Sequence, residues 1–181
     1  PSSFAMVRSA ELQKTNTRNV MFVDIGFTQT SIIIYHDNLI RFTRVVEKGF
    51  NDIYQVLMQK YNIQSSEAIS KAIDIGLIEN ANHNIKTIIT PVYNFIFSEI
   101  TRAILYYQSI HQDFNLEKII FSGEGSIVPG LVTYAKHNIA VDAEILNPFE
   151  TLVHSAKKER ELEFKGPIFS VPVGLTLKEF I

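Results

Sequence analysis

Residues 20–44 read VMFVDIGFTQTSIIIYHDNLIRFTR, and this stretch decides the fold class. Three apolar or β-branched runs follow one another closely here, at 20–25, 30–35 and 39–46. Strands joined by such short links pair in antiparallel fashion. The pair Asp37-Asn38 suits a tight turn, because both residue types tolerate the left-handed backbone conformation. The sequence therefore predicts a three-stranded antiparallel meander.

Beyond Gly49 the apolar pattern changes to helical spacing, broken by two short strand-like runs. The predicted helices are 3–12, 51–61, 65–76, 85–111, 129–137 and 169–180, and the predicted later strands are 118–122 and 142–146. Pro91 interrupts the longest pattern, so that helix either begins there with Thr90 as its cap or kinks there. Residues 15–19 are polar and predict a loop.

This order of elements predicts an α/β domain. Three antiparallel strands followed by two parallel crossovers give a mixed five-stranded sheet with helices on both faces. The arrangement resembles the ribonuclease-H-like unit, of which the actin-like ATPase fold holds two copies.

Composition excludes several function classes. The 181 residues carry a formal net charge of -2 and no cysteine, so disulfides and thiolate metal sites are excluded. No basic stripe points to nucleic acid, and the short run 157–160 predicts a solvated loop or helix end. No apolar run approaches the ~20 residues of a membrane span, so direct membrane insertion is not expected. The chain opens on Pro1, from which we expect sequence upstream.

Two further groups of side chains have simple interpretations. The five histidines show no pair at metal-ligand spacing and are expected at the surface or in loops. Tyr106 and Tyr107 place one ring inward and one sideways on the predicted helix. Core packing explains the inward ring, and a partner surface is one interpretation of the other.

The turn after the first strand is a candidate phosphate site. Asp24 ends the strand, and Gly26 lets the backbone fold back so that unpaired N–H groups can converge on an anion. Thr28 and Thr30 could add hydroxyl donors, and Asp24 could hold Mg²⁺ through water. Taken alone the motif is weak, and an ordinary hairpin with a structural glycine is the alternative interpretation.

A second glycine turn follows the predicted strand 118–122. It comprises Gly123, Glu124, Gly125 and Ser126, directly before a predicted helix, where backbone can approach a ligand closely. A plain βα turn is the alternative. Because ligands of open α/β sheets bind at the carboxyl ends of strands, we expect Gly26 and Gly123 to face each other across one opening.

Together these stretches resemble the actin-like ATPase superfamily. Residues 20–44 are similar to its phosphate-binding hairpin, and IIFSGEGSIVPGL (119–131) is similar to its adenine-side loop. Three more stretches resemble the PilM family of type IV pilus assembly, a relative of FtsA. They are EITRAILYY (99–107), AEILNPFE (143–150) and PIFSVPVGLTLKEF (167–180). The resemblance runs from about residue 3 to 181.

The resemblance implies a two-lobed cytoplasmic scaffold, peripheral to the inner membrane, that holds ATP and Mg²⁺ in a cleft. It also implies docking onto the cytoplasmic tail of the inner-membrane protein PilN through the first lobe. The resemblance further implies that residues 1–181 correspond to the second lobe only, so the expected partners include the chain's own first lobe. The matching positions are Asp24, Gly26 and Thr30 in the hairpin and Gly123, Gly125 and Ser126 in the adenine-side loop.

Some positions depart from the family pattern. Glu124 stands where glycine is usual, and its carboxylate is expected to repel phosphates nearby. Phe50 replaces a second glycine after Gly49, and Glu67 and Lys71 are one position out of step with the ribose-binding pattern. These departures are expected to weaken ATP binding. Because no residue here is an evident base to activate water, nucleotide is expected to clamp the lobes rather than serve as fuel, with at most weak ATPase activity.

Two other functions stay open at this stage. One is an FtsA-like cell-division protein, which would carry a membrane-binding helix beyond a linker. The other is a sugar or acetate kinase of the same superfamily, whose catalytic carboxylate comes mostly from the first lobe. We also expect the lone lobe to self-associate.

Overall fold

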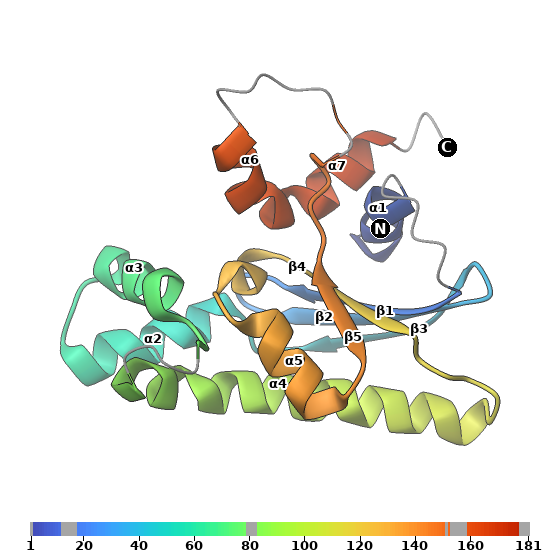
Figure 1. The fold of residues 1–181 in the computed structure, drawn as a ribbon, viewed down its shortest axis with the longest axis horizontal. Helices are drawn as coiled ribbons and strands as arrows, with labels where there is room; N and C mark the ends of the chain where they lie inside the picture. Colours follow the sequence, from blue (N-terminus) through green and yellow to red (C-terminus); the bar gives the residue numbers. More distant parts are fainter. Residues whose placement is uncertain (1, 12–17, 79–82, 151, 153–158, 178–181) are drawn as a thin grey trace.

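A computed structural model describes residues 2–11, 18–78, 83–150, 152 and 159–177 (Figure 1). Its centre is one five-stranded sheet in the order β3-β2-β1-β4-β5. The strands are β1 (Asn19–Ile25), β2 (Thr30–His36), β3 (Leu39–Val46), β4 (Lys118–Ser122) and β5 (Asp142–Ile145).

The pairing of the strands confirms the predicted topology. β1 pairs antiparallel with β2, and β2 pairs antiparallel with β3. On its other side β1 pairs parallel with β4, which pairs parallel with β5. Asp37 and Asn38 have φ angles of 51° and 60°, the left-handed conformation expected of the tight turn between β2 and β3.

Helices cover both faces of the sheet (Figure 1). On one face lie α2 (Phe50–Tyr61), α3 (Ser65–Ile75), α4 (His83–Ile110) and α5 (Leu131–Ile139). On the other lie α1 (Ser2–Glu11) and α7 (Ser170–Thr176), which contact each other, with α6 (Glu159–Lys165) to the left of α7 in this view. Short 3-10 turns span Glu124–Ile127 and Gly166–Phe169.

The central strands are apolar on both sides because each face has its own core. Along β1, Met21, Val23 and Ile25 pack toward α4, while Val20 and Phe22 pack toward α1. This alternation follows the two-residue period of a strand. Since β1 and β4 are buried on both faces, their carboxyl ends are held rigidly, and the turns that follow them inherit that rigidity.

The structure differs from the sequence predictions at three helices. α4 begins at His83 and runs through Pro91, so a start at Pro91 is wrong; the flanking residues on both sides supply enough buried side chains to keep the helix continuous. α5 begins at Leu131, not Pro129. The predicted closing helix divides into the turn 166–169 and α7, and residues 178–181 lie outside the described part.

α6 was not predicted, because its seven residues are mostly charged and show no apolar period. It contains the end of the run 157–160, of which 157 and 158 lie outside the described residues. In the described part of the chain, no helix combines the length and apolarity that crossing a membrane requires.

Candidate functional site

The hairpin loop between β1 and β2 caps the start of α2. The carbonyl of Gly26 accepts a hydrogen bond of 2.9 Å from the amide of Phe50, and the carbonyl of Phe27 accepts one of 2.7 Å from Asn51. The first amides of a helix have no partner within it, so these two carbonyls satisfy them. The loop is thereby fixed to the helix.

This capping also fixes the direction of the loop's own amides. In a trans peptide the N–H points opposite to the C=O of the same unit. Because the carbonyls of Gly26 and Phe27 point at α2, the amides of Phe27 and Thr28 point away from it. Two successive amides on one side of a turn form an anion-binding concavity.

Gly49 permits this close approach. A Cβ at this position would lie 2.6 Å from the carbonyl oxygen of Gly26 and 2.7 Å from that of Phe27. Those atoms belong to the backbone and cannot swing aside. Gly49 is therefore required for the contact between hairpin and α2, whereas the exchange of the usual second glycine for Phe50 is accommodated, with its side chain buried in the core.

The second glycine turn lies against the first. Gly123 has a φ of +83°, and a Cβ on it would lie 2.5 Å from the carbonyl oxygen of Ile25 and 2.7 Å from Oδ1 of Asp24. Its amide donates to the carbonyl of Pro167 at 3.0 Å, which ties the turn to the C-terminal helices. Only glycine combines that backbone conformation with that packing.

The two turns line one cleft of about 440 Å³. Its walls come from three parts of the chain: the hairpin, the turn after β4, and the start of the α7 region. The lining residues are Asp24, Gly26, Phe27, Thr28, Gln29, Ser31, Gly123, Glu124, Ile168 and Val171. Gly26 and Gly123 thus share a single opening at the carboxyl ends of β1 and β4, as expected from the sequence.

Two carboxylates lie in this cleft. Asp24 accepts a hydrogen bond of 2.8 Å from the hydroxyl of Ser122, yet burial raises the pKa of Asp24 above its ordinary value. Oε2 of Glu124 lies 4.0 Å from the place a Cβ would take on Gly26, so this carboxylate reaches the hairpin. The cleft therefore combines amide donors with two negative charges, which suits an anion accompanied by a divalent cation.

Three of the predicted site residues are not brought into the cleft. Thr30 is fully buried, and its hydroxyl donates to the carbonyl of Lys48 at 2.7 Å, so its only O–H is used. The hydroxyl of Ser126 donates to the carbonyl of Gly123 at 2.7 Å. Gly125 packs on Ile25, and its carbonyl accepts a hydrogen bond from Tyr93. These residues shape the turns rather than line the opening.

Five lining residues were not among the predicted site residues. Ser31 pairs with Asp24 across the hairpin, so alternation along β2 could have identified it. Phe27 and Gln29 belong to the predicted turn itself. Ile168 and Val171 reach the cleft only through the packing of α7, and no local sequence pattern predicts that contact.

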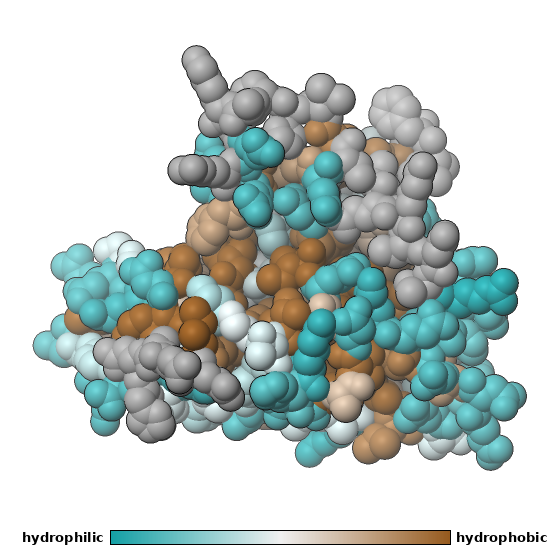
Figure 2. Space-filling model, in the orientation of Figure 1, coloured by the Kyte–Doolittle hydropathy of each residue, from teal (hydrophilic) through white to brown (hydrophobic). Residues whose placement is uncertain are grey.

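A larger hollow of about 570 Å³ lies between β5 and α6. Its lining includes Ile127, Ile145, Phe149 and Phe164, together with Glu159 and Glu163. Figure 2 shows apolar surface gathered in the middle of this face, with hydrophilic side chains around it. Part of the lining of this hollow comes from the stretch 143–150, whereas the two glycine turns line the cleft.

Side chains that commonly bind metal ions do not cluster in the described part of the structure. Among the residues that the structure describes, no three His, Cys, Asp or Glu side chains gather as a metal site. Glu67 and Lys71 form an ion pair of 3.5 Å along α3 and are not among the residues that line the cleft.

The sheet order, the glycine turns and the cleft together define an actin-like domain. The solved structures agree. A PilM–PilN type IV pilus biogenesis complex matches with a TM-score of 0.78 and 22% identity, covering 98% of this chain and 51% of that one. The ethanolamine utilization protein EutJ from Carboxydothermus hydrogenoformans matches with a TM-score of 0.69 and 18% identity, covering 97% of this chain and 53% of that one. MreB5 of Spiroplasma citri bound to AMPPNP matches with a TM-score of 0.68 and 13% identity, covering 97% of this chain and 58% of that one.

The family model for the type IV pilus assembly protein PilM matches residues 2–180, and the chain belongs to that family. The chain spans about half the length of the solved proteins it resembles.

Proposed function

We propose that this chain is the second lobe of a two-lobed, actin-like scaffold protein that assembles type IV pilus or competence machinery. The observation that carries the proposal is the family match over residues 2–180. It favours pilus assembly over the FtsA-like and kinase alternatives. That the chain spans half of its relatives supports the assignment of 1–181 to one lobe.

The cleft is proposed to hold ATP with Mg²⁺. The amides of Phe27 and Thr28 and the hydroxyl of Thr28 would hold phosphate oxygens, and Asp24 would hold the cation through water. Gly26 and Gly123 keep both turns close to the ligand. The cation would neutralise phosphate charge beside Asp24 and Glu124. A complete site needs the other lobe, so ATP would act as a clamp between lobes.

Apart from Asp24 and Glu124, no described residue that lines the cleft carries a carboxylate or imidazole that could activate water as a general base. We therefore propose at most weak ATPase activity, with nucleotide in a structural or regulatory role. Calorimetry with ATP and Mg²⁺ on protein that carries both lobes tests this. Absence of binding at millimolar ATP would reject the clamp.

The partner is proposed to be the cytoplasmic tail of a PilN-like inner-membrane protein, gripped by the first lobe. One of the similar solved structures is a PilM–PilN complex, which supports this choice. The protein would then be cytoplasmic and peripheral to the inner membrane. In a pull-down, two-lobed protein should retain a PilN-like tail peptide; failure to retain it removes the main support for the scaffold role.

Self-association of the isolated lobe remains a prediction. Phe27, at the cleft, is 47% exposed, and such apolar surface on the face toward the other lobe favours association of two copies. Light scattering tests it, and a strictly monomeric mass would contradict it.

A further inference from the structure

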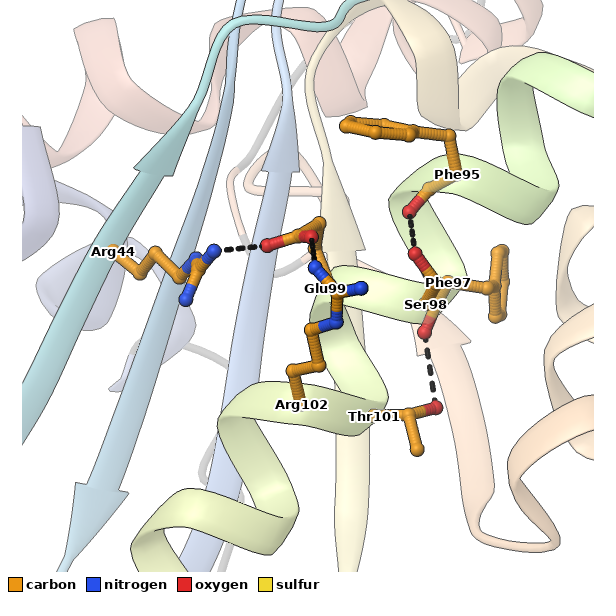
Figure 3. A network of polar contacts seen from close by, with 7 residues as sticks. All are labelled: Arg44, Phe95, Phe97, Ser98, Glu99, Thr101 and Arg102. Carbon is orange, nitrogen blue, oxygen red and sulfur yellow. Dashed lines mark hydrogen bonds and ion pairs between the residues drawn. The ribbon is translucent and has the colours of Figure 1, made fainter.

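A buried carboxylate outside the cleft holds two arginines together. Glu99, on α4, is only 3% exposed. One of its oxygens contacts the guanidinium of Arg44 on β3, and the other accepts a hydrogen bond of 2.7 Å from Arg102, one turn further along α4 (Figure 3). Glu99 therefore fixes both guanidinium groups at the junction of β3 and α4.

The charges of this cluster do not balance. One carboxylate faces two permanently charged guanidinium groups, and the side chains of Arg44 and Arg102 are 43% and 68% exposed. β3 also carries Arg41, which is exposed, and contains no acidic residue. Glu99 is the only acidic residue of α4. The surplus positive charge therefore faces solvent, with most guanidinium N–H donors unused by Glu99.

The same arginines border an open strand edge. β3 is the last strand on its side of the sheet, and no described strand pairs with its outer edge. Val45, next to Arg44, is 57% exposed. An open edge offers a row of backbone donors and acceptors to an added strand. Arg44 thus sits where a side chain of such a strand would meet it.

An aromatic surface continues the site along α4. The ring of Tyr106 lies 5.7 Å from that of Phe42 on β3, and Tyr106 is 56% exposed. It follows Arg102 by four residues and so lies on the same face of the helix. The open edge of β3, the guanidinium groups of Arg44 and Arg102 and the ring of Tyr106 form one strip. A small anion would contact only the guanidinium groups of this strip.

We propose that the outer edge of β3, with Arg44, Arg102 and Tyr106, docks an acidic extended segment of a partner protein. The segment adds a strand to β3, a carboxylate of the segment binds the guanidinium pair, and an apolar side chain covers Tyr106. Charge complementarity selects this occupant: the strip is basic, and Glu99 orders the two cations in advance so that little side-chain entropy is lost on binding. The strip does not overlap the cleft lining, so it is independent of the proposed nucleotide site.

A synthetic peptide tests the proposal. The probe is a fluorescein-labelled seven-residue peptide of alternating valine and glutamate, and its twin carries glutamine in place of glutamate. Binding to the 181-residue chain is measured by fluorescence anisotropy, and protection of residues 39–46 by hydrogen exchange. We expect the glutamate peptide to bind about tenfold more tightly than its twin, with protection of 39–46.

Variants locate the binding site. Arg44→Gln combined with Arg102→Gln should weaken binding of the glutamate peptide about tenfold, whereas Arg18→Gln, at an exposed arginine before β1, should leave it unchanged. If the double variant does not fold, Arg102→Gln alone serves, because that side chain is the more exposed. It should still weaken binding severalfold.

Three results would overturn the proposal. The first is equal affinity for the two peptides, or no binding of either. The second is binding of the glutamate peptide without protection of 39–46, or complete displacement of the bound peptide by inorganic phosphate, which indicates a small-anion site. The third is a dimer of the chain that the double variant dissociates, which assigns the strip to a second copy.

Discussion

The hydroxyl of Tyr93, fully buried on α4, donates a hydrogen bond of 2.8 Å to the carbonyl of Gly125. This bond joins the longest helix to the glycine turn after β4, across 32 residues of sequence. It satisfies a carbonyl that has little access to water.

Replacing Tyr93 with Phe removes the donor and keeps the ring. A buried carbonyl without its partner costs about 1–3 kcal/mol, so the free energy of unfolding should fall by that amount. Urea denaturation followed by circular dichroism measures it. A matched control is Tyr106→Phe, whose exposed side chain should change stability by less than about 0.5 kcal/mol. Equal effects of the two variants would contradict a special role for the Tyr93 bond.

The buried phenol of Tyr93 should also make the free energy of unfolding sensitive to alkaline pH. Burial raises the pKa of Tyr93 well above its ordinary value of 10.0. The unfolded chain therefore releases this proton at lower pH than the folded chain, so the contribution to stability is complete below pH 10.0 and declines as pH rises beyond it. Tyr93→Phe should flatten this decline, with Tyr35, Tyr107 and Tyr134 still contributing a smaller one. Unfolding curves at pH 8 to 11 (about three pH units) test it; identical slopes would refute it.

Glycine at position 49 should be far less replaceable than glycine at 26. A Cβ on Gly49 would lie 2.6 Å from a backbone oxygen, whereas on Gly26 the nearest atom would be 3.1 Å away. Gly49→Ala must push the hairpin off α2, at a cost of about 1–3 kcal/mol, and Gly26→Ala should cost less. Thermal unfolding of both variants gives the comparison. A larger loss for Gly26→Ala would show that the hairpin moves easily.

The strands and the two turns were predictable because their signals are local. The β-branched run at 30–35, the alternation along 39–46, the Asp37-Asn38 turn and the glycines at 26 and 123 each act over a few residues. The meeting of Gly26 and Gly123 also followed, since strands β1 and β4 run parallel and end at one edge.

Other features depend on contacts far apart in sequence. Thr30 was placed in the site by its residue type, but the burial of β2 turns its hydroxyl toward Lys48. Ile168 enters the cleft through the packing of α7, and Glu99 meets Arg44 only after α4 docks on β3. No local pattern carries that information.

Asp24 should make the protein less stable at neutral pH than its asparagine variant. Burial raises its pKa above the ordinary 3.8, so the favourable contribution is complete below that pH and is lost as pH rises through the folded-state value. At pH 7 the buried charge is a cost, and Asp24→Asn should stabilise the fold by up to about 1 kcal/mol. The gain should vanish near pH 3 (about one unit below the ordinary value). Paired denaturation curves at the two pH values test this; a loss of stability at pH 7 would contradict it.

Glu124 should weaken nucleotide binding through its charge. Its carboxylate reaches the hairpin whose amides are proposed to hold phosphate, and like charges at short range in a partly dry cleft repel. In protein with both lobes, Glu124→Gln and Glu124→Gly should each tighten ATP–Mg²⁺ binding severalfold, and by up to about tenfold or 1.4 kcal/mol. Calorimetry measures the dissociation constants. Glutamine keeps the size of glutamate, so tighter binding by Glu124→Gly alone would mean that the size of the side chain, and not its charge, weakens binding. Weaker binding by both variants would mean that Glu124 helps to hold the cation.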